Sequence, residues 1–237
     1  MIMEELNVLY EDNHVIVVCK PQNIPVQADA SEDLDMLTMV KNYVKEKYNK
    51  PGEAYIGLVH RLDRPTGGVM VFARTSKAAA RLCEAIKSGD MEKTYLTVVC
   101  GTPREKQAYL THYLKKNEKT NTVMVVPQTT EGAKKAELSY RVLESKNGVS
   151  LLSVDLITGR SHQIRVQMAT IGTPLYADVK YGGEKAIRGS HLALWATELK
   201  FTHPTTGKRM TFRVFPPENQ PFTQFDMNLY LGLSIKE

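Results

Sequence analysis

The segment of the chain that is richest in chemical groups is His60-Arg61-Leu62-Asp63-Arg64-Pro65-Thr66-Gly67-Gly68, which lies between two short apolar runs. Its one carboxylate, Asp63, has a histidine and two arginines as neighbours. Positive charge keeps a carboxylate ionised and available as a nucleophile or a base. Pro65 stiffens the segment, and the two glycines allow a sharp turn or a close approach to a ligand. A surface turn with an internal salt bridge is the alternative, since Asp, Pro and Gly are turn residues.

A second segment with chemical potential is Thr158-Gly159-Arg160-Ser161-His162-Gln163-Ile164-Arg165. An expected strand ends at its first two residues, and Ser161 is placed to cap a helix that begins near His162. Arg160, His162 and Arg165 then gather around the first turn, where the N-terminus of a helix favours anions. The segment therefore predicts a phosphate or carboxylate site. A helix cap surrounded by solvated arginines explains it equally well.

Several familiar kinds of site have no support in the sequence. The chain lacks a G-x-x-x-x-G-K-[ST] phosphate loop, a G-x-G-x-x-G fingerprint and a G-x-S-x-G elbow. It also lacks a C-x-x-C pair and an H-E-x-x-H motif, so we expect no metal. Cys19, Cys83 and Cys100 are far apart, which indicates reduced thiols in a cytoplasmic protein and not a disulfide framework.

Composition and charge limit the class of protein. The chain has 237 residues, 42% of them hydrophobic and 24% charged, which excludes disorder and fibres and allows one large domain or two small ones. No apolar run approaches the roughly 18 residues of a membrane span, and the acidic start lacks a secretory pattern. Residues 1–59 hold 5 Lys and Arg against 10 Asp and Glu, whereas residues 60–237 hold 26 against 16. A basic majority is compatible with a polyanionic partner, although a solvated surface explains it too.

The elements that must position these segments follow from the apolar patterning. Residues 15–19 are a short β-branched run before a lysine and a proline, which is typical of a buried strand. Apolar residues three and four apart then predict an amphipathic helix, capped by Ser31 or Asp33. An alanine-rich helix is expected to open at Thr75 and to end before Gly89. We predict helices over residues 31–48, 75–88 and 162–171, and strands over residues 15–19, 57–60, 69–73, 94–100, 108–114, 122–126, 137–143, 151–157, 192–201 and 210–215. This pattern predicts a mixed α+β domain with a large, mostly antiparallel sheet.

The chain resembles the RluA-type pseudouridine synthases. The resemblance spans roughly residues 8 to 217, and five motifs in the family's order carry it, which makes it highly specific. The five are the opening strand and lysine-proline turn at residues 10–21, the signature H-R-L-D-x-x-T-S-G at residues 60–69, the tyrosine strand at residues 93–95, T-G-R-x-H-Q-I-R at residues 158–165, and F-x-H-P-x-T-G at residues 201–207. One departure is Gly67 where the family usually has Ser, from which we expect altered loop flexibility without loss of activity.

The resemblance implies the pseudouridine synthase fold, an α+β catalytic domain built on a large mixed, mostly antiparallel sheet flanked by helices. We expect one such domain over residues 1–237, without the separate N-terminal RNA-binding domain of many relatives. The implied activity is isomerisation of uridine to pseudouridine in structured RNA, either rRNA or tRNA. This reaction needs no cofactor and no metal. We expect a cytoplasmic monomer that does not bind membranes.

The resemblance also implies roles for individual residues. Asp63 would be the catalytic carboxylate, acting either as a nucleophile on the sugar or as a base, and Arg165 would pair with it. Tyr95 would stack on the uracil and remove the C5 proton, and Ile164 would form part of an apolar wall. Arg61 would fill the space left by the flipped base. Arg160 and His162 are expected to bind substrate, and Arg64 and the lysine pairs at 115–116 and 134–135 are candidates for phosphate contacts.

Two other functions are compatible with the same residues. One is an RNA-binding or ribosome-assembly factor on this fold with secondary or no isomerase activity. The other is a retaining glycosidase or nucleoside hydrolase, but glycosidases normally need two facing carboxylates. Residues 60–68 and 158–165 contain only one, Asp63.

Overall fold

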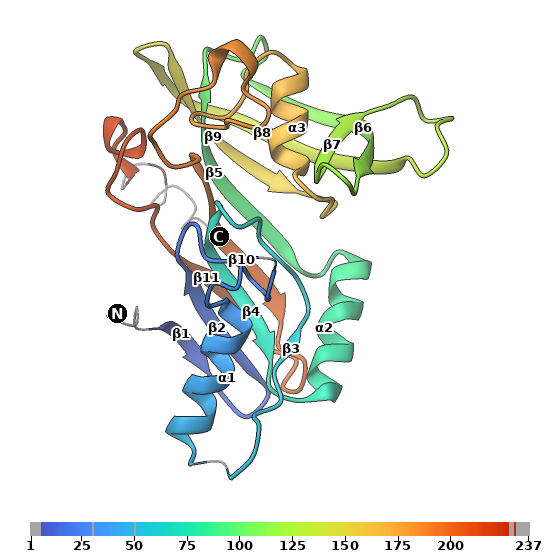
Figure 1. Cartoon of the computed structure of the whole chain (residues 1–237), viewed down its shortest axis with the longest axis vertical. Coiled ribbons are helices and arrows are strands. Elements are labelled where there is room, and N and C mark those ends of the chain that lie inside the picture. Colours follow the sequence, from blue (N-terminus) through green and yellow to red (C-terminus); the bar gives the residue numbers. More distant parts are fainter. Residues whose placement is uncertain (1–5, 30, 50, 228–229, 231–237) are drawn as a thin grey trace. The chain divides into compact units, whose positions relative to one another are not determined.

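The chain divides into two compact units in a computed structural model that describes residues 6–29, 31–49, 51–227 and 230. The first unit takes in Met1–Glu92 and Ala196–Val214, and the second takes in Lys93–Trp195 and Phe215–Glu237. Both units combine strands with helices (Figure 1). No helix in the described part of the chain is both long and apolar enough to cross a membrane.

The first unit is built on strands whose order is β1, β2, β4 and β10, with β3 on β4 and β11 on β10. Four of these strand pairs are antiparallel: β1 with β2, β2 with β4, β3 with β4, and β10 with β11. All seven residues of β4 are buried, so this strand runs through the core of the unit. The strands are β1 (Asn7–Glu11), β2 (Val15–Lys20), β3 (Gly57–Leu58), β4 (Gly67–Ala73), β10 (Leu194–Thr202, of which the last seven residues belong here) and β11 (Arg209–Arg213).

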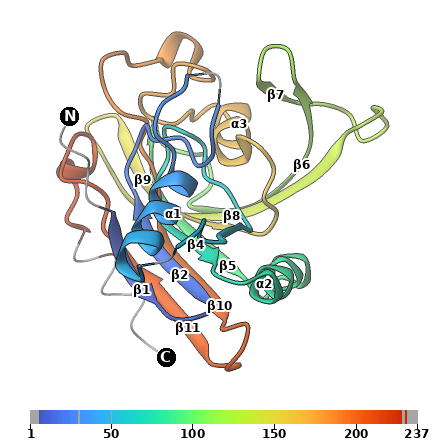
Figure 2. The ribbon, with the colours of Figure 1, turned by 60° about the horizontal axis from the view of Figure 1, so that its bottom comes forward.

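Two helices cover this unit. The helix α1 (Met36–Lys47) lies over β1 and β2, and α2 (Ser76–Ser88) contacts β3 and β4 (Figure 2). Asp35 caps α1, since its Oδ1 accepts a hydrogen bond from the Thr38 amide at 3.0 Å. The predicted caps Ser31 and Asp33 were therefore placed too early. The prediction for α2 is confirmed at both ends: Thr75 Oγ1 accepts from the Ala78 amide, and Gly89 takes a left-handed φ of 82°.

The second unit contains five strands in the order β5, β9, β8, β6 and β7, all paired antiparallel. Its helix α3 (Gln163–Thr170) packs on β6 and β7, where Leu114, Val123, Ala136 and Val166 form a buried apolar cluster. The strands are β5 (Glu92–Cys100), β6 (Gln107–Asn117), β7 (Thr122–Val125), β8 (Lys134–Lys146) and β9 (Val149–Leu156), and two short 3₁₀ turns are η1 (Gly183–Lys185) and η2 (Phe222–Gln224).

The predicted α+β class with mostly antiparallel strands and flanking helices is confirmed by the eleven strands and three α-helices of the described residues. One strand, β1, was missed because its apolar run is only three residues long, shorter than the four to eight that indicate a buried strand. The predicted cap of α3 was wrong. The residue before the helix is His162, in the left-handed region at φ 50° and without a side-chain cap, and not Ser161.

Candidate active site

The loop that carries Asp63 joins β3 to β4 and is anchored on both sides of the carboxylate. Leu62 is 8% exposed and Thr66 is 2% exposed, whereas Asp63 between them is half-buried. The Thr66 amide donates to the Asp63 carbonyl at 2.9 Å, which closes a tight turn. His60 is occupied elsewhere, because its Nε2 accepts from the Val71 amide of β4 at 3.1 Å. These contacts hold the loop in place, and His60 braces it against β4.

A buried lysine lies under this loop. Lys20 is fully buried at the end of β2, and its Nζ donates to the carbonyl oxygens of Pro21 at 2.9 Å and Arg64 at 3.0 Å. Burial lowers the pKa of Lys20 from 10.5 to about 7, and the nearby Asp63 carboxylate partly opposes this effect. Lys20 thus ties the lysine-proline turn to the residue that follows Asp63. The sequence placed Lys20 in a motif but gave it no role.

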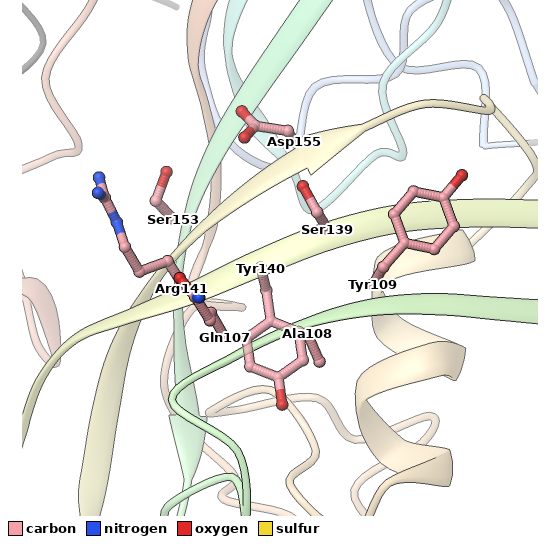
Figure 3. Close-up of a pocket in the computed structure, with 8 residues that line it drawn as sticks. All are labelled: Gln107, Ala108, Tyr109, Ser139, Tyr140, Arg141, Ser153 and Asp155. Carbon is pink, nitrogen blue, oxygen red and sulfur yellow. The ribbon is translucent and has the colours of Figure 1, made fainter.

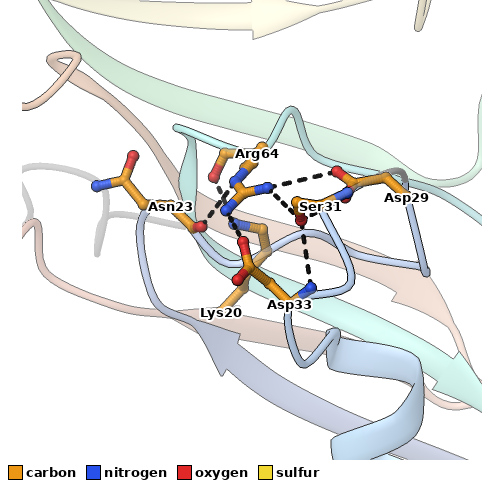
Figure 4. Close-up of polar contacts among 6 residues, drawn as sticks. All are labelled: Lys20, Asn23, Asp29, Ser31, Asp33 and Arg64. Atoms are coloured by element: carbon orange, nitrogen blue, oxygen red, sulfur yellow. Dashed lines mark hydrogen bonds and ion pairs between the residues drawn. The ribbon is translucent and has the colours of Figure 1, made fainter.

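Arg64 faces back toward the segment before α1 (Figure 4). Its Nε donates to the Asn23 carbonyl at 3.1 Å and its Nη1 to Ser31 Oγ at 2.8 Å. The guanidinium also pairs with Asp33 and, at 3.5 Å, with Asp29. The hydrogen bond from Arg64 is the largest cause of a lowered pKa at Asp33. Arg64 therefore fastens the loop of Asp63 to the segment before α1, which is a different use from the phosphate contact expected of it.

Two further residues of this segment, Gly68 and Arg61, differ in their surroundings. Gly68 has a φ of 121°, and a Cβ built on it would lie 2.2 Å from the Ala196 carbonyl oxygen of β10. Only glycine allows β4 to approach its neighbour this closely. Arg61 is exposed beside Asp63.

In the second unit, Tyr95 lies on β5 and is 6% exposed. It pairs with Val154 of β9, and residues alternate between the two faces of a strand. Lys93, Tyr95 and Thr97 therefore share one face of β5. Thr97 links this face of β5 to the segment just before β10, because its Oγ1 donates to the Ala193 carbonyl at 2.6 Å.

Arg165 of α3 is held by a carboxylate that sequence reasoning missed. Its Nε and Nη2 donate to the two oxygens of Asp178, each at 2.8 Å. The side chains of Arg165 and Asp178 are 7% and 0% exposed. Asp178 Oδ1 also accepts from the amides of Lys180 and Tyr181, and the guanidinium lies over the Tyr181 ring at 5.0 Å. A two-point pair of this kind fixes the plane of the guanidinium.

A glycine gives the only sequence signal for this pair that we can identify. The Gly182 amide donates to the Asp178 carbonyl at 2.7 Å, and a Cβ on Gly182 would lie 2.4 Å from that oxygen. The Gly182-Gly183 step thus marks a turn that closes on the backbone carbonyl of Asp178.

The His162 ring forms a hydrogen bond with Tyr181. Its Nδ1 lies 2.6 Å from the Tyr181 hydroxyl, which in turn accepts from the Val123 amide at 2.9 Å. Ile164, the next predicted site residue on this segment, is 4% exposed. The Tyr181 ring therefore touches both His162 and Arg165.

Gln163 organises the turn before α3. Its Oε1 accepts from Thr158 Oγ1 at 2.8 Å and from the Arg160 amide at 3.0 Å, and its Nε2 donates to the Glu137 carbonyl. Arg160 itself is exposed, and its Nε donates to the Lys135 carbonyl at 2.9 Å. The T-G-R turn is thus held by an amide side chain to which the sequence gave no role.

A shallow polar hollow of about 520 Å³ lies on the second unit (Figure 3). Tyr109, Ser139 and Asp155 form one cross-strand row in it, whereas Tyr95 pairs with Val154 in the adjacent row. Adjacent rows face opposite sides of a sheet, so the hollow opens on the side away from Tyr95. It includes none of the predicted site residues. Its lining is Gln107, Ala108, Tyr109, Ser139, Tyr140, Arg141, Ser153 and Asp155.

The predicted site residues thus fall into two groups. Arg61 and Asp63 share the loop of the first unit, whereas the second unit holds the remaining five, which are Tyr95, Arg160, His162, Ile164 and Arg165. In the described residues, no group of three or more His, Cys, Asp and Glu side chains could hold a metal ion.

Comparisons with known proteins place the chain in a family. Residues 14–170, which include parts of both units, match the family described as RNA pseudouridylate synthase. Ribosomal large subunit pseudouridine synthase D of Vibrio cholerae is 33% identical over 228 residues, covering 90% of this chain and 68% of that protein. The RNA pseudouridine synthase YlyB of Bacillus subtilis, itself uncharacterised, is 32% identical over 216 residues, covering 91% and 70%.

Solved structures agree in fold. Human RNA pseudouridylate synthase domain containing 4 superposes with a TM-score of 0.73 at 21% identity, covering 89% of this chain and 88% of that one. Human RNA pseudouridylate synthase domain containing 1 gives 0.72 at 22% identity, covering 98% and 96%. The family pattern and the relatives support RNA pseudouridine synthase activity, and the chain belongs to the RNA pseudouridylate synthase family.

Proposed function

We propose that this protein isomerises specific uridines of RNA to pseudouridine with Asp63 as its catalytic carboxylate. The observation that carries the proposal is the family match over residues 14–170, which contains Asp63, Tyr95 and Arg165. The rigid loop around Asp63 supports it, since a catalytic group needs a fixed position.

The reaction breaks the N-glycosidic bond, rotates the uracil and forms a C–C bond at its C5, so that the C5 hydrogen leaves as a proton. Asp63 either attacks the sugar or abstracts a ribose proton, and both roles need an ionised carboxylate near the ribose. We infer that Arg165, its plane set by Asp178, pairs with Asp63. Tyr95 stacks on the uracil and takes the C5 proton, and Ile164 lines the pocket.

The target uridine must leave its stack, at a cost of a few kcal/mol. Arg61 is exposed beside Asp63 and fills the space that the base vacates. Arg160 and His162 bind substrate from the turn before α3, and the Tyr181 hydroxyl fixes the orientation of the His162 ring.

We propose rRNA of the large ribosomal subunit as the substrate, because several relatives are named for it. Transfer RNA is the alternative target. The enzyme is expected to act as a monomer in the cytoplasm without a cofactor.

Tritium release tests the proposal, because pseudouridine formation frees the hydrogen at C5. Total RNA labelled with [5-³H]uridine, from a host that lacks the gene, is incubated with the parent chain, Asp63→Asn and Asp155→Asn. Asp155 is an exposed carboxylate in the hollow and serves as the control. We expect release by the parent and the control, and none by Asp63→Asn.

Three outcomes would sink parts of the proposal. No release by the parent enzyme contradicts the isomerase activity and leaves the RNA-binding alternative. Free uracil among the products indicates a glycosidase. Release only from isolated tRNA, with none from large-subunit rRNA, rejects the proposed target.

A further inference from the structure

Lys93 is the first residue of the second unit and lies two positions before Tyr95 on β5. Strand alternation puts the two side chains on the same face, about 6.6 Å apart along the strand. The ammonium group also lies beside the T-G-R turn, because a Cβ built on Gly159 would be 3.7 Å from Lys93 Nζ. Lys93 therefore stands between the strand of Tyr95 and the turn that precedes α3.

Its surroundings differ from those of Lys20 and Lys135. Lys93 is half-buried, and burial alone lowers the pKa of its amine. No hydrogen bond or ion pair engages its Nζ within the part of the chain that the structure describes. By contrast, Lys20 donates to two carbonyls, and Lys135 lies 2.7 Å from Glu137. An amine that is desolvated without a partner is costly to the fold. Such groups are found preferentially where a ligand supplies the missing partner.

We propose that Lys93 binds a backbone phosphate of the RNA strand next to the uridine that stacks on Tyr95. The inference rests on the proposed function, since it uses Tyr95 as the position of the uracil. A single nucleotide can reach both groups, given their separation on the strand. Phosphate is the RNA group that suits this amine, because a compact ammonium binds phosphate oxygens as a point charge.

The proposal is tested by neutralising one lysine and measuring the salt dependence of RNA binding. Affinity for a fluorescein-labelled oligouridylate of about 12 nucleotides is measured by anisotropy for the parent chain, Lys93→Met and Lys93→Arg. Potassium chloride is varied from roughly 50 to 200 mM. Lys77→Met is the matched control, since Lys77 is an exposed lysine on α2 without a hydrogen bond or ion pair to any residue that the structure describes.

We expect Lys93→Met to bind about 10-fold more weakly, as for the loss of one charge-assisted hydrogen bond. The slope of log affinity against log salt should become shallower by about 0.7, the value for one phosphate in a single strand. Lys93→Arg should restore the slope, and Lys77→Met should match the parent. Since a half-buried charge with no partner among the described residues is removed, the melting temperature of Lys93→Met should stay constant or rise.

An unchanged slope in Lys93→Met overturns the proposal. So does a fall in its melting temperature with RNA affinity unchanged, because that result identifies a structural lysine. Absence of binding by the parent at the lowest salt also overturns it. Tritium release is scored separately on the same samples. A chain that binds through Lys93 but releases no tritium would refute the isomerase activity and leave the phosphate contact intact.

Discussion

Replacing Asp178 by Asn tests whether this carboxylate orients Arg165. The amide keeps one acceptor oxygen but turns a donor toward the guanidinium, so one of the two 2.8 Å hydrogen bonds is lost together with the negative charge. The side chains are 7% and 0% exposed, so water cannot replace the missing partner. The guanidinium left in this position is a buried charge that has lost the Asp178 carboxylate.

Removing one partner of a buried pair costs about 3–5 kcal/mol. A chain of this length loses roughly 2–4 °C of melting temperature per kcal/mol, so Asp178→Asn should melt roughly 6–20 °C below the parent. The rate of tritium release should fall as well, on the order of 100-fold for a group displaced by 1 Å. Arg165→Lys should not replace the arginine, because an ammonium cannot make the two-point contact.

A double-mutant cycle separates orientation from simple loss of packing. Arg165→Met with Asp178→Asn removes both charges, so the double variant should be more stable than the sum of the single effects by at least about 2 kcal/mol. Urea denaturation of the parent, the two single variants and the double variant gives the four free energies of unfolding. If Asp178→Asn changes the free energy by less than about 1 kcal/mol, or if the two substitutions are additive, Arg165 does not depend on Asp178.

Three further substitutions test the loop of the first unit. Burial lowers the pKa of Lys20 to about 7, so between pH 7 and 10.5 the unfolded chain binds more protons and the free energy of unfolding rises with pH. In urea titrations across pH 7.5–9.5, the difference in this free energy between the parent and Lys20→Met should change by about 1.4 kcal/mol per pH unit. Parallel curves for the two proteins would contradict the lowered pKa. Gly68→Ala places a Cβ against the backbone of β10 and should lower the free energy of unfolding by at least about 3 kcal/mol. Gly89→Ala is the control, because Gly89 also has a positive φ but faces open space, and it should lower this free energy by only about 1 kcal/mol in thermal unfolding. Equal losses of stability in the two variants would refute the clash. Arg64→Gln should raise the pKa of Asp33 toward its ordinary value in a carbon NMR titration, and no change would exclude their pairing.

Local signals in the sequence were sufficient where neighbours in the chain decide the structure. Thr75 and Gly89 set both ends of α2 through their own backbone preferences. The start of α1 was not decided locally, because several residues with capping side chains precede it. The Met36 amide donates to the Pro25 carbonyl at 2.9 Å, and this contact selects Asp35 as the cap. No periodicity in the sequence encodes it.

The same limit applies to the site. The sequence pointed to Asp63 but assigned His60 as one of its positive neighbours, whereas His60 accepts a hydrogen bond from β4. The buried amine near Asp63 is that of Lys20, forty-three positions earlier in the chain. Lys20 pairs with Gly68 in the register of β2 and β4, so the loop and the lysine meet through strand pairing. Asp178 was missed for a similar reason, since its partner on α3 is thirteen residues away across a turn.

The two lysines whose pKa is lowered by burial differ in what surrounds the amine. Lys20 donates to two carbonyls within the fold, so its neutralisation should disturb the loop around Asp63 and slow catalysis with little change in the salt dependence of RNA binding. Lys93 has no such partner in the described residues, so its neutralisation should change the salt dependence and spare the fold. Desolvation alone would make the two variants behave alike. Opposite responses of Lys20→Met and Lys93→Met in one set of binding and melting experiments would therefore show that the partner of each amine decides its role.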